Sequence, residues 1–143
     1  MSDMSIDNNE GTEENAEEKF QELLGEAEQG DADAMYELGQ CYNSGEGVEK
    51  NYEEAAKWYR KSAEQGHGWG QHHLGQCYYD GKGVAQNYEE AFKWHRKAAE
   101  QGIAWSQKIL AGLYKFGVGV KQSDEEAIKW FMESKYGNHE AGS

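Results

Sequence analysis

The chain of 143 residues contains no proline, only two cysteines, and only 14 basic residues against 27 acidic ones. It has no apolar run long enough for the hydrophobic region of a signal peptide or for a transmembrane helix. The formal net charge of −13 repels phosphate groups, so we expect no binding to nucleic acids or to anionic membranes. These absences predict a cytoplasmic protein of about one domain.

A repeat with a period of 36 residues organises most of the chain. The stretch 74–102 repeats the stretch 38–66, and a more divergent copy begins at Leu110. The tryptophans that recur at this spacing are Trp58, Trp94 and Trp130. A fixed period of this length predicts a solenoid, in which each unit buries its apolar face against its neighbours. We therefore expect the three periodic tryptophans to lie in the core.

The pattern inside each repeat predicts two helices joined by a glycine-rich turn. The first helices are expected at 32–44, 68–80 and 104–116, each ending at a glycine suited to the left-handed conformation. The second helices are expected to start at capping residues followed three positions later by a glutamate, namely Asn51, Asn87 and Ser123. Gly39 and Gly75 recur inside first helices, which predicts that a neighbouring helix passes close to the backbone there.

We therefore predict an all-α fold, a short right-handed α/α solenoid of about three 36-residue helix-turn-helix repeats with an N-terminal capping helix. The predicted segments are a disordered acidic arm at 1–16, a capping helix at 17–30, repeats at 31–65, 66–101 and 102–137, and a loose tail at 138–143. The arm is expected to be disordered because residues 1–30 carry ten acidic side chains against Lys19. Lys135 replaces the alanine of the earlier repeats, which predicts that the array ends there.

Cys41 and Cys77 are one period apart and so occupy the same place in successive repeats. Equivalent positions in stacked helices are about 9–10 Å apart. A disulfide requires Cα atoms within about 7 Å of each other. We therefore expect two free, buried thiols in a reducing compartment.

The sequence contains no motif that predicts catalysis, a metal or a cofactor. His73 and Cys77 are one helical turn apart, but a zinc site needs three or four protein ligands and no second pair is present. The Gly-x-Gly-Val turns lack the strand and the Lys-Ser/Thr of a phosphate-binding loop. His95 replaces Tyr59 and Phe131 in a core-facing stripe, which predicts a buried histidine whose polar atoms are satisfied.

The phrases Leu-Gly-x-x-Tyr, Gly-x-Gly-Val, Ala-x-x-Trp-Tyr and Ala-Glu-Gln-Gly at this period resemble the Sel-one-like repeats, relatives of the tetratricopeptide repeats. The resemblance covers residues 19–136. It implies a non-enzymatic protein that binds other proteins, as an adaptor, a regulator or an inhibitor such as a bacterial immunity protein. A secreted, cysteine-rich branch of the family pairs cysteines within each repeat, and it implies an alternative function as a β-lactam-type hydrolase or small-molecule binder.

By analogy with tetratricopeptide arrays, the first helices are expected to line a concave groove for a peptide or loop of another protein. The predicted groove residues are Tyr36, Gln40, Asn43, Trp69, His72, Gln76, Tyr79, Trp105, Lys108 and Lys115. Trp69 and Trp105 stand where the first repeat has Asp33, and they either anchor the partner or pack on the preceding helix end. We expect Lys108 and Lys115 to contact an acidic end of the partner segment. We expect the chain itself to be a monomer.

Overall fold

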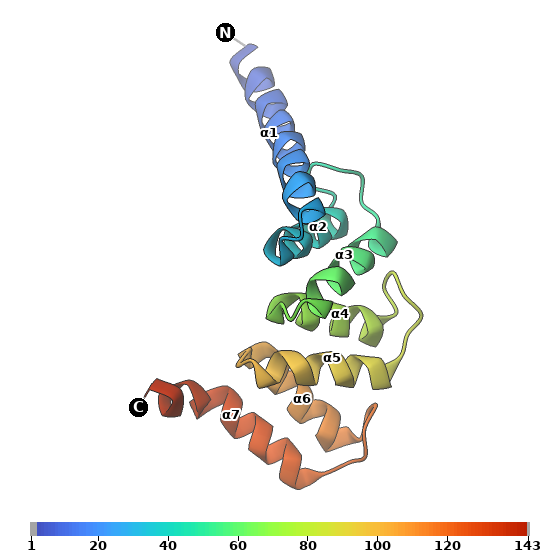
Figure 1. Cartoon of the computed structure of the whole chain (residues 1–143), viewed down its shortest axis with the longest axis vertical. Helices are drawn as coiled ribbons and strands as arrows, with labels where there is room; N and C mark the ends of the chain where they lie inside the picture. Colours follow the sequence, from blue (N-terminus) through green and yellow to red (C-terminus); the bar gives the residue numbers. More distant parts are fainter. Residues whose placement is uncertain (1–2, 143) are drawn as a thin grey trace.

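Seven helices form the part of the chain that the structure describes, and no strand occurs among those residues. The computed structural model describes the backbone of residues 3–142 and the side chains of residues 11 and 13–137. The helices are α1 (Asp3–Glu28), α2 (Ala32–Ser44), α3 (Tyr52–Glu64), α4 (Gly68–Asp80), α5 (Tyr88–Glu100), α6 (Ala104–Phe116) and α7 (Asp124–Gly142). They stack one after another along an arc (Figure 1). The predicted all-α repeat solenoid is confirmed.

The bounds of the helices follow from the capping residues in the sequence. Asn51 and Asn87 each accept a hydrogen bond from the backbone N–H three residues later. Ser123 does the same at the start of α7. The first helices end at glycines with positive φ, which are Gly45, Gly81 and Gly117. The predicted bounds of α2, α4 and α6 are confirmed.

The two end helices are longer than predicted. α1 begins at Asp3 rather than Glu17, so the structure has helical backbone over residues 3–16, where we expected the acidic arm. Asn15 corresponds to Asn51 in the 36-residue register, but no Gly-x-Gly-Val turn precedes it to end the helix, and glutamate and alanine favour its continuation. α7 continues through most of the expected loose tail at 138–143. Residues 1, 2 and 143 lie outside the described residues.

The core is a series of clusters between successive helices, with one fully buried leucine in each repeat. These leucines are Leu38, Leu74 and Leu110. A Cβ atom added at Gly39 would lie 2.5 Å from the ring of Tyr59, and one added at Gly75 would lie 2.8 Å from the ring of His95. The recurrent glycines therefore have the packing role that we predicted, because α3 and α5 pass too close for a larger residue.

The periodic tryptophans and the cysteines are buried to different degrees. Trp94 and Trp130 are buried as predicted, whereas Trp58 is only half-buried under the ammonium group of Lys61. Both cysteines are free thiols. Cys77 is buried, and its burial raises its pKa to about 11. Cys41 is half-buried, so the prediction of two buried thiols is wrong for this residue, which lines an open cavity beside α1.

Candidate partner-binding groove

Trp69 and Trp105 stand at the starts of α4 and α6, and both rings are open to solvent. The exposed fractions of the two residues are 41% and 64%. Lys108 lies one turn after Trp105, with its ammonium group 5.6 Å from the centre of the indole ring. Packing on the preceding helix end therefore leaves a large part of each indole uncovered, which favours the partner-anchor interpretation over the core interpretation.

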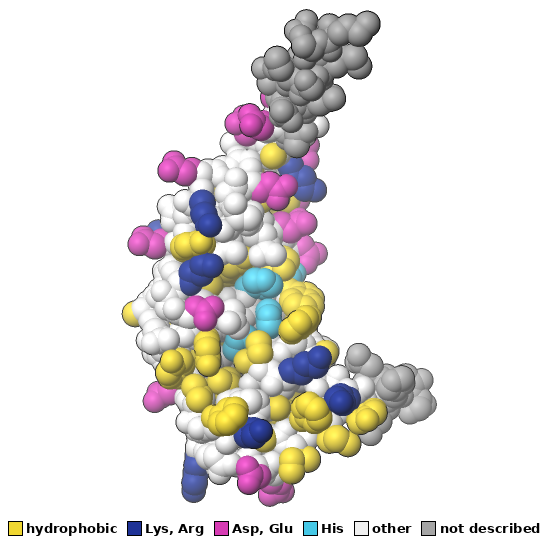
Figure 2. All heavy atoms as spheres, turned by 180° about the vertical axis from the view of Figure 1, so that it is seen from behind, with side chains coloured by type: hydrophobic (Ala, Val, Ile, Leu, Met, Phe, Trp, Pro, Cys, Tyr) yellow, Lys and Arg dark blue, Asp and Glu magenta, His cyan; other side chains and the backbone are white. Residues whose placement is uncertain are grey.

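Trp69 belongs to a cluster of aromatic and histidine rings that joins α2, α3 and α4. Its ring centre lies 5.4 Å from that of His72 and 6.4 Å from that of His73. The ring of His73 in turn lies 5.2 Å from Tyr36 and 5.1 Å from Tyr59. His73 therefore connects two predicted groove residues, Tyr36 and Trp69, which belong to different repeats. Figure 2 shows histidine side chains beside hydrophobic ones where the outline of the molecule is hollowed.

His67 holds the start of α4 in place and links it to α2. The backbone N–H of Gly70 donates to His67 Nδ1 over 3.0 Å, so His67 caps the helix as Asp31 caps α2. With Nδ1 accepting, Nε2–H donates to Asp33 Oδ1 over 2.7 Å. The imidazole also stacks on Tyr36, with the ring centres 5.1 Å apart. The bonds of His67 to Gly70 and to Asp33 thus restrain the start of α4 and, with it, the position of Trp69 two residues later.

His72 and His95 share the hydroxyl group of Ser106 at the start of α6. Ser106 Oγ lies 2.7 Å from His72 Nδ1 and 3.5 Å from His95 Nδ1. Burial lowers the pKa of His72 to about 4, with a contribution from His73. Burial also lowers the pKa of His95 to about 3, with contributions from both neighbouring histidines. Both rings are therefore neutral near pH 7.

The prediction that His95 is a satisfied core histidine is correct only in part. His95 is fully buried, but its Nε2 atom has no hydrogen-bond partner among the described residues. A Cβ atom added at Gly75 would lie 2.9 Å from this Nε2 atom, so the backbone of α4 passes close to this edge of the ring. A buried polar atom without a hydrogen-bond partner lowers the stability of the folded protein.

The other predicted groove residues lie outside the ring cluster, apart from Gln40, which accepts a hydrogen bond from the Tyr59 hydroxyl group. Gln76 donates to Asp80 on its own helix. The Tyr79 ring lies 5.2 Å from that of Tyr88, and the ammonium group of Lys115 lies 5.3 Å from the ring of Phe116. Asn43 is half-buried. The structure thus unites Tyr36, Gln40, Trp69 and His72 by direct contacts.

Five residues in or beside the cluster were absent from our predicted groove. These are His67, His73, Tyr59, His95 and Ser106. The phrase from Gly66 to His73 signals His67 and His73, because it is richer in glycine and histidine than the other helix starts. His73 also follows Trp69 by four residues and so shares its helix face. Among the described side chains, no group of three or more possible ligands could hold a metal ion.

The comparisons with known proteins identify the repeat. The family model of the Sel1 repeat matches residues 32–67, 70–103 and 106–132. The chain belongs to the Sel1 repeat family. Sel1 repeat proteins generally mediate protein–protein interactions, and the family is generally a non-enzymatic scaffold. None of the described helices has the length and the apolar character needed to cross a membrane.

Solved structures of other Sel1 repeat proteins resemble this one. A Sel1 repeat protein from Oxalobacter formigenes is 39% identical with a TM-score of 0.80, over 83% of this chain and 49% of that one. The protective antigen c5321 of uropathogenic Escherichia coli, which displays an SLR fold, is 37% identical with a TM-score of 0.78, over 87% of this chain and 26% of that one. This chain thus spans half or less of the length of these two relatives.

A third solved structure matches a smaller share of this chain. Cysteine rich protein B of Helicobacter pylori is 33% identical with a TM-score of 0.61, over 64% of this chain and 68% of that one. A comparison with curated protein sequences gave no match.

Proposed function

We propose that this Sel1 repeat protein is a non-enzymatic interaction module that binds a segment of another protein along the surface around Trp69 and Trp105. The observation that carries the proposal is the exposure of the two indoles at the starts of successive first helices. Exposed tryptophans held by rigid neighbours bury a large area on binding at a small entropic cost. The hydrogen bonds of His67 and the ring contacts of His73 provide that rigidity for Trp69.

The charge of the chain favours an adaptor or an inhibitor of the immunity type, whose partner is basic. Residues 1–30 hold ten acidic side chains against Lys19, and residues 3–28 of this segment form α1 at one end of the array. A concentrated negative field of this kind raises the association rate with a basic protein. The cysteine-rich branch that acts on β-lactams is a weaker model, because this chain has two free cysteines in separate repeats.

The experiment that tests the proposal replaces both tryptophans. The Trp69→Ala/Trp105→Ala variant should bind the protein partner more weakly by about 2–4 kcal/mol, because two anchor side chains are lost. Its melting temperature should change little, since neither residue is buried: Trp105 is 64% exposed and Trp69 is 41% exposed. The partner is first captured from extracts of the native cell by the wild-type protein, and its affinity for each variant is then measured by isothermal titration calorimetry.

A matched control removes two other exposed apolar side chains that lie outside the predicted groove. Ile128 and Met132 of α7 are 63% and 48% exposed. The Ile128→Ala/Met132→Ala variant should bind the partner with the affinity of the wild type. Unchanged affinity in the tryptophan variant, together with a large loss of its melting temperature, would show that the indoles serve folding instead.

A further inference from the structure

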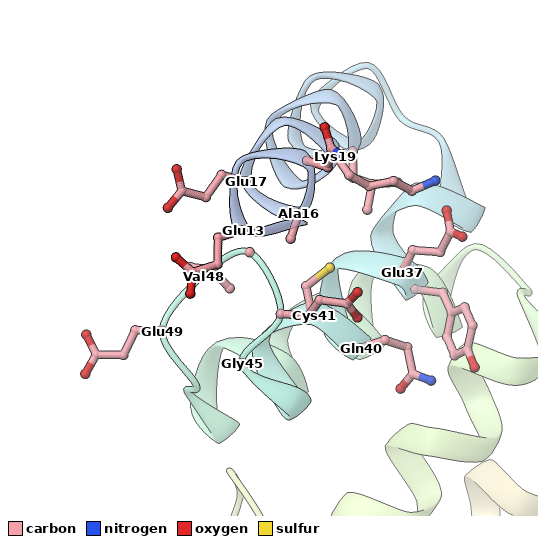
Figure 3. Close-up of a pocket in the computed structure, with 15 residues that line it drawn as sticks. Glu13, Ala16, Glu17, Lys19, Glu37, Gln40, Cys41, Gly45, Val48 and Glu49 are labelled. Atoms are coloured by element: carbon pink, nitrogen blue, oxygen red, sulfur yellow. The ribbon is translucent and has the colours of Figure 1, made fainter. Parts of the chain in front are cut away.

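A cavity of about 940 Å³ lies between α1, α2 and the turn that follows α2. Figure 3 shows Ala16 of α1, Cys41 of α2 and Val48 of the turn around it, with the sulfur of Cys41 pointing from α2 toward α1. Tyr36 and Gln40 also line the cavity. Both are predicted groove residues, so the cavity adjoins the surface described above.

The cavity lies where two rings of the next junction are replaced by other side chains at the junction of α1 and α2. Between α3 and α4, Tyr59 is fully buried and its ring lies 5.1 Å from that of His73. In the 36-residue register, Leu23 takes the place of Tyr59, and Glu37 takes the place of His73. Leucine is smaller than tyrosine, and the glutamate carries a charge that resists burial. The space that two rings fill between α3 and α4 therefore stays open between α1 and α2.

The lining of the cavity combines an apolar floor with an acidic rim. Ala16, Leu23, Cys41 and Val48 supply the apolar part. The acidic residues are Glu13, Glu17, Glu37, Glu46 and Glu49, and the only basic residue among those that line the cavity is Lys19. Among the described residues, none of these five carboxylates forms an ion pair. Beyond the charge of Lys19, solvent ions or a cationic ligand relieve the repulsion among these carboxylates.

We propose that this cavity binds a basic amphipathic segment of the protein partner, with a lysine or arginine side chain among the glutamates and an aliphatic side chain on the floor. The inference rests on the proposed function and names the chemistry of the partner. Charge complementarity decides the occupant, because an acidic or neutral segment would leave the carboxylates unpaired. The opposite end of the groove carries Lys108 and Lys115. The basic part of the partner therefore lies at α1 and its acidic part at α6.

The test uses Cys41 as a reporter on the floor of the cavity. The probes are two synthetic 12-residue peptides of leucine with arginine or leucine with glutamate, both at helical amphipathic spacing. The rate of alkylation by iodoacetamide is measured at Cys41 and Cys77 by mass spectrometry, with and without peptide. Cys77 is buried and reports on unfolding. For a Kd of about 0.1 mM and about 1 mM peptide, the arginine peptide should slow alkylation of Cys41 about tenfold.

Glutamate-to-glutamine variants test whether the arginine peptide binds at the acidic rim of the cavity. Glu13→Gln/Glu37→Gln/Glu46→Gln should abolish the protection of Cys41, and each variant is compared with itself without peptide. The control Glu53→Gln/Glu89→Gln/Glu125→Gln changes the net charge by the same amount in the first turns of α3, α5 and α7, and it should leave the protection intact. The glutamate peptide should give no protection.

The tryptophan variant distinguishes a failure of this inference from a failure of the proposed function. Trp69→Ala/Trp105→Ala should leave the protection by the arginine peptide unchanged, although it weakens binding of the native partner. Equal protection by both peptides, no protection by the arginine peptide, or protection that survives in the cavity variant would overturn the inference. If the tryptophan variant still loses affinity for the partner in any of these cases, the proposed function stands without the basic segment.

Discussion

One position on the second helix of each repeat shows how a single side chain changes the local chemistry of an otherwise regular array. Tyr59 is buried there and donates its hydroxyl hydrogen to Gln40. His95 is equally buried, but its Nε2 atom has no partner among the described residues. Phe131 has no polar side-chain atom and is half covered, with the ammonium group of Lys135 lying 5.0 Å from its ring. At this position the middle repeat thus buries a polar atom without a partner, which the equivalent Tyr59 and Phe131 do not.

The His95→Phe variant should be more stable than the wild type by about 1 kcal/mol at pH 7, because it removes a buried polar atom without a partner. It should also lose stability less steeply as the pH falls. The pKa of His95 is about 3 in the folded protein and near 6.5 in the unfolded chain. Between these values only the unfolded chain binds the proton, so the contribution of neutral His95 is present above pH 6.5 and is lost as the pH falls.

Urea denaturation between pH 8 and pH 5 measures this effect. Tyr59→Phe is the matched control, since it changes the equivalent side chain of the preceding repeat and titrates nothing in that range. It should lower the free energy of unfolding by about 1 kcal/mol at every pH, through loss of the bond to Gln40. A His95→Phe protein whose pH dependence equals that of the wild type would show that the other histidines carry the whole effect.

At the scale of the helix, glycine has two opposite roles in the first helices. At Gly75 an added Cβ atom would lie 2.8 Å from the His95 ring, whereas at Gly112 nothing lies within 4 Å. Gly75→Ala should therefore destabilise the protein by about 1–3 kcal/mol through overpacking. Gly112→Ala should stabilise it by up to about 1 kcal/mol through helix propensity. Thermal denaturation of both variants measures the difference, and a stabilised Gly75→Ala protein would contradict the close approach of α5.

The helices could be predicted from the sequence because their ends are chemically marked. Asn51, Asn87 and the glycines after α2, α4 and α6 set the bounds through local hydrogen bonds and positive φ. The length of α1 could not be predicted, because Asn15 looks like a cap and only the lack of a preceding glycine turn lets the helix continue. A propensity for disorder and a propensity for helix compete in such acidic segments.

The candidate site was less predictable than the helices. Trp69 and Trp105 were found because they break the repeat at one position. The contact of His72 with Ser106 joins residues 34 apart and depends on how the repeats stack. The cavity beside α1 could be recognised only once Leu23 was seen opposite α2, since its volume depends on side-chain size across two helices. Periodicity therefore predicts the core better than it predicts surfaces.

At the scale of the whole molecule, stability should be the sum of the repeats and of the interfaces between them. The helices contact mainly their neighbours in sequence, and the same turn geometry recurs at Gly30, Gly66 and Gly102, each with positive φ. A Cβ atom added at Gly83 or Gly119 would also meet equivalent backbone carbonyl groups, those of Tyr52 and Tyr88. Each repeat therefore offers the next one the same docking surface, and the array should accept one more unit in register.

A chain in which residues 66–101 are duplicated directly after Gln101 should fold with two further helices and melt at a higher temperature than the wild type. The duplicate adds one complete repeat and one further interface, and nearest-neighbour interactions make both contributions favourable. Circular dichroism measures the helical content and the melting temperature.

The control duplicates residues 67–101 and so omits the glycine with positive φ between α5 and the inserted helix. This one-residue deletion shifts the register and forces His67 into the turn, so the control should melt below the in-register chain. A lower melting temperature for the in-register chain than for the wild type would show that the repeats are not interchangeable. The contacts specific to one junction, above all those of His72 and His95 with Ser106, would then outweigh the common stacking geometry.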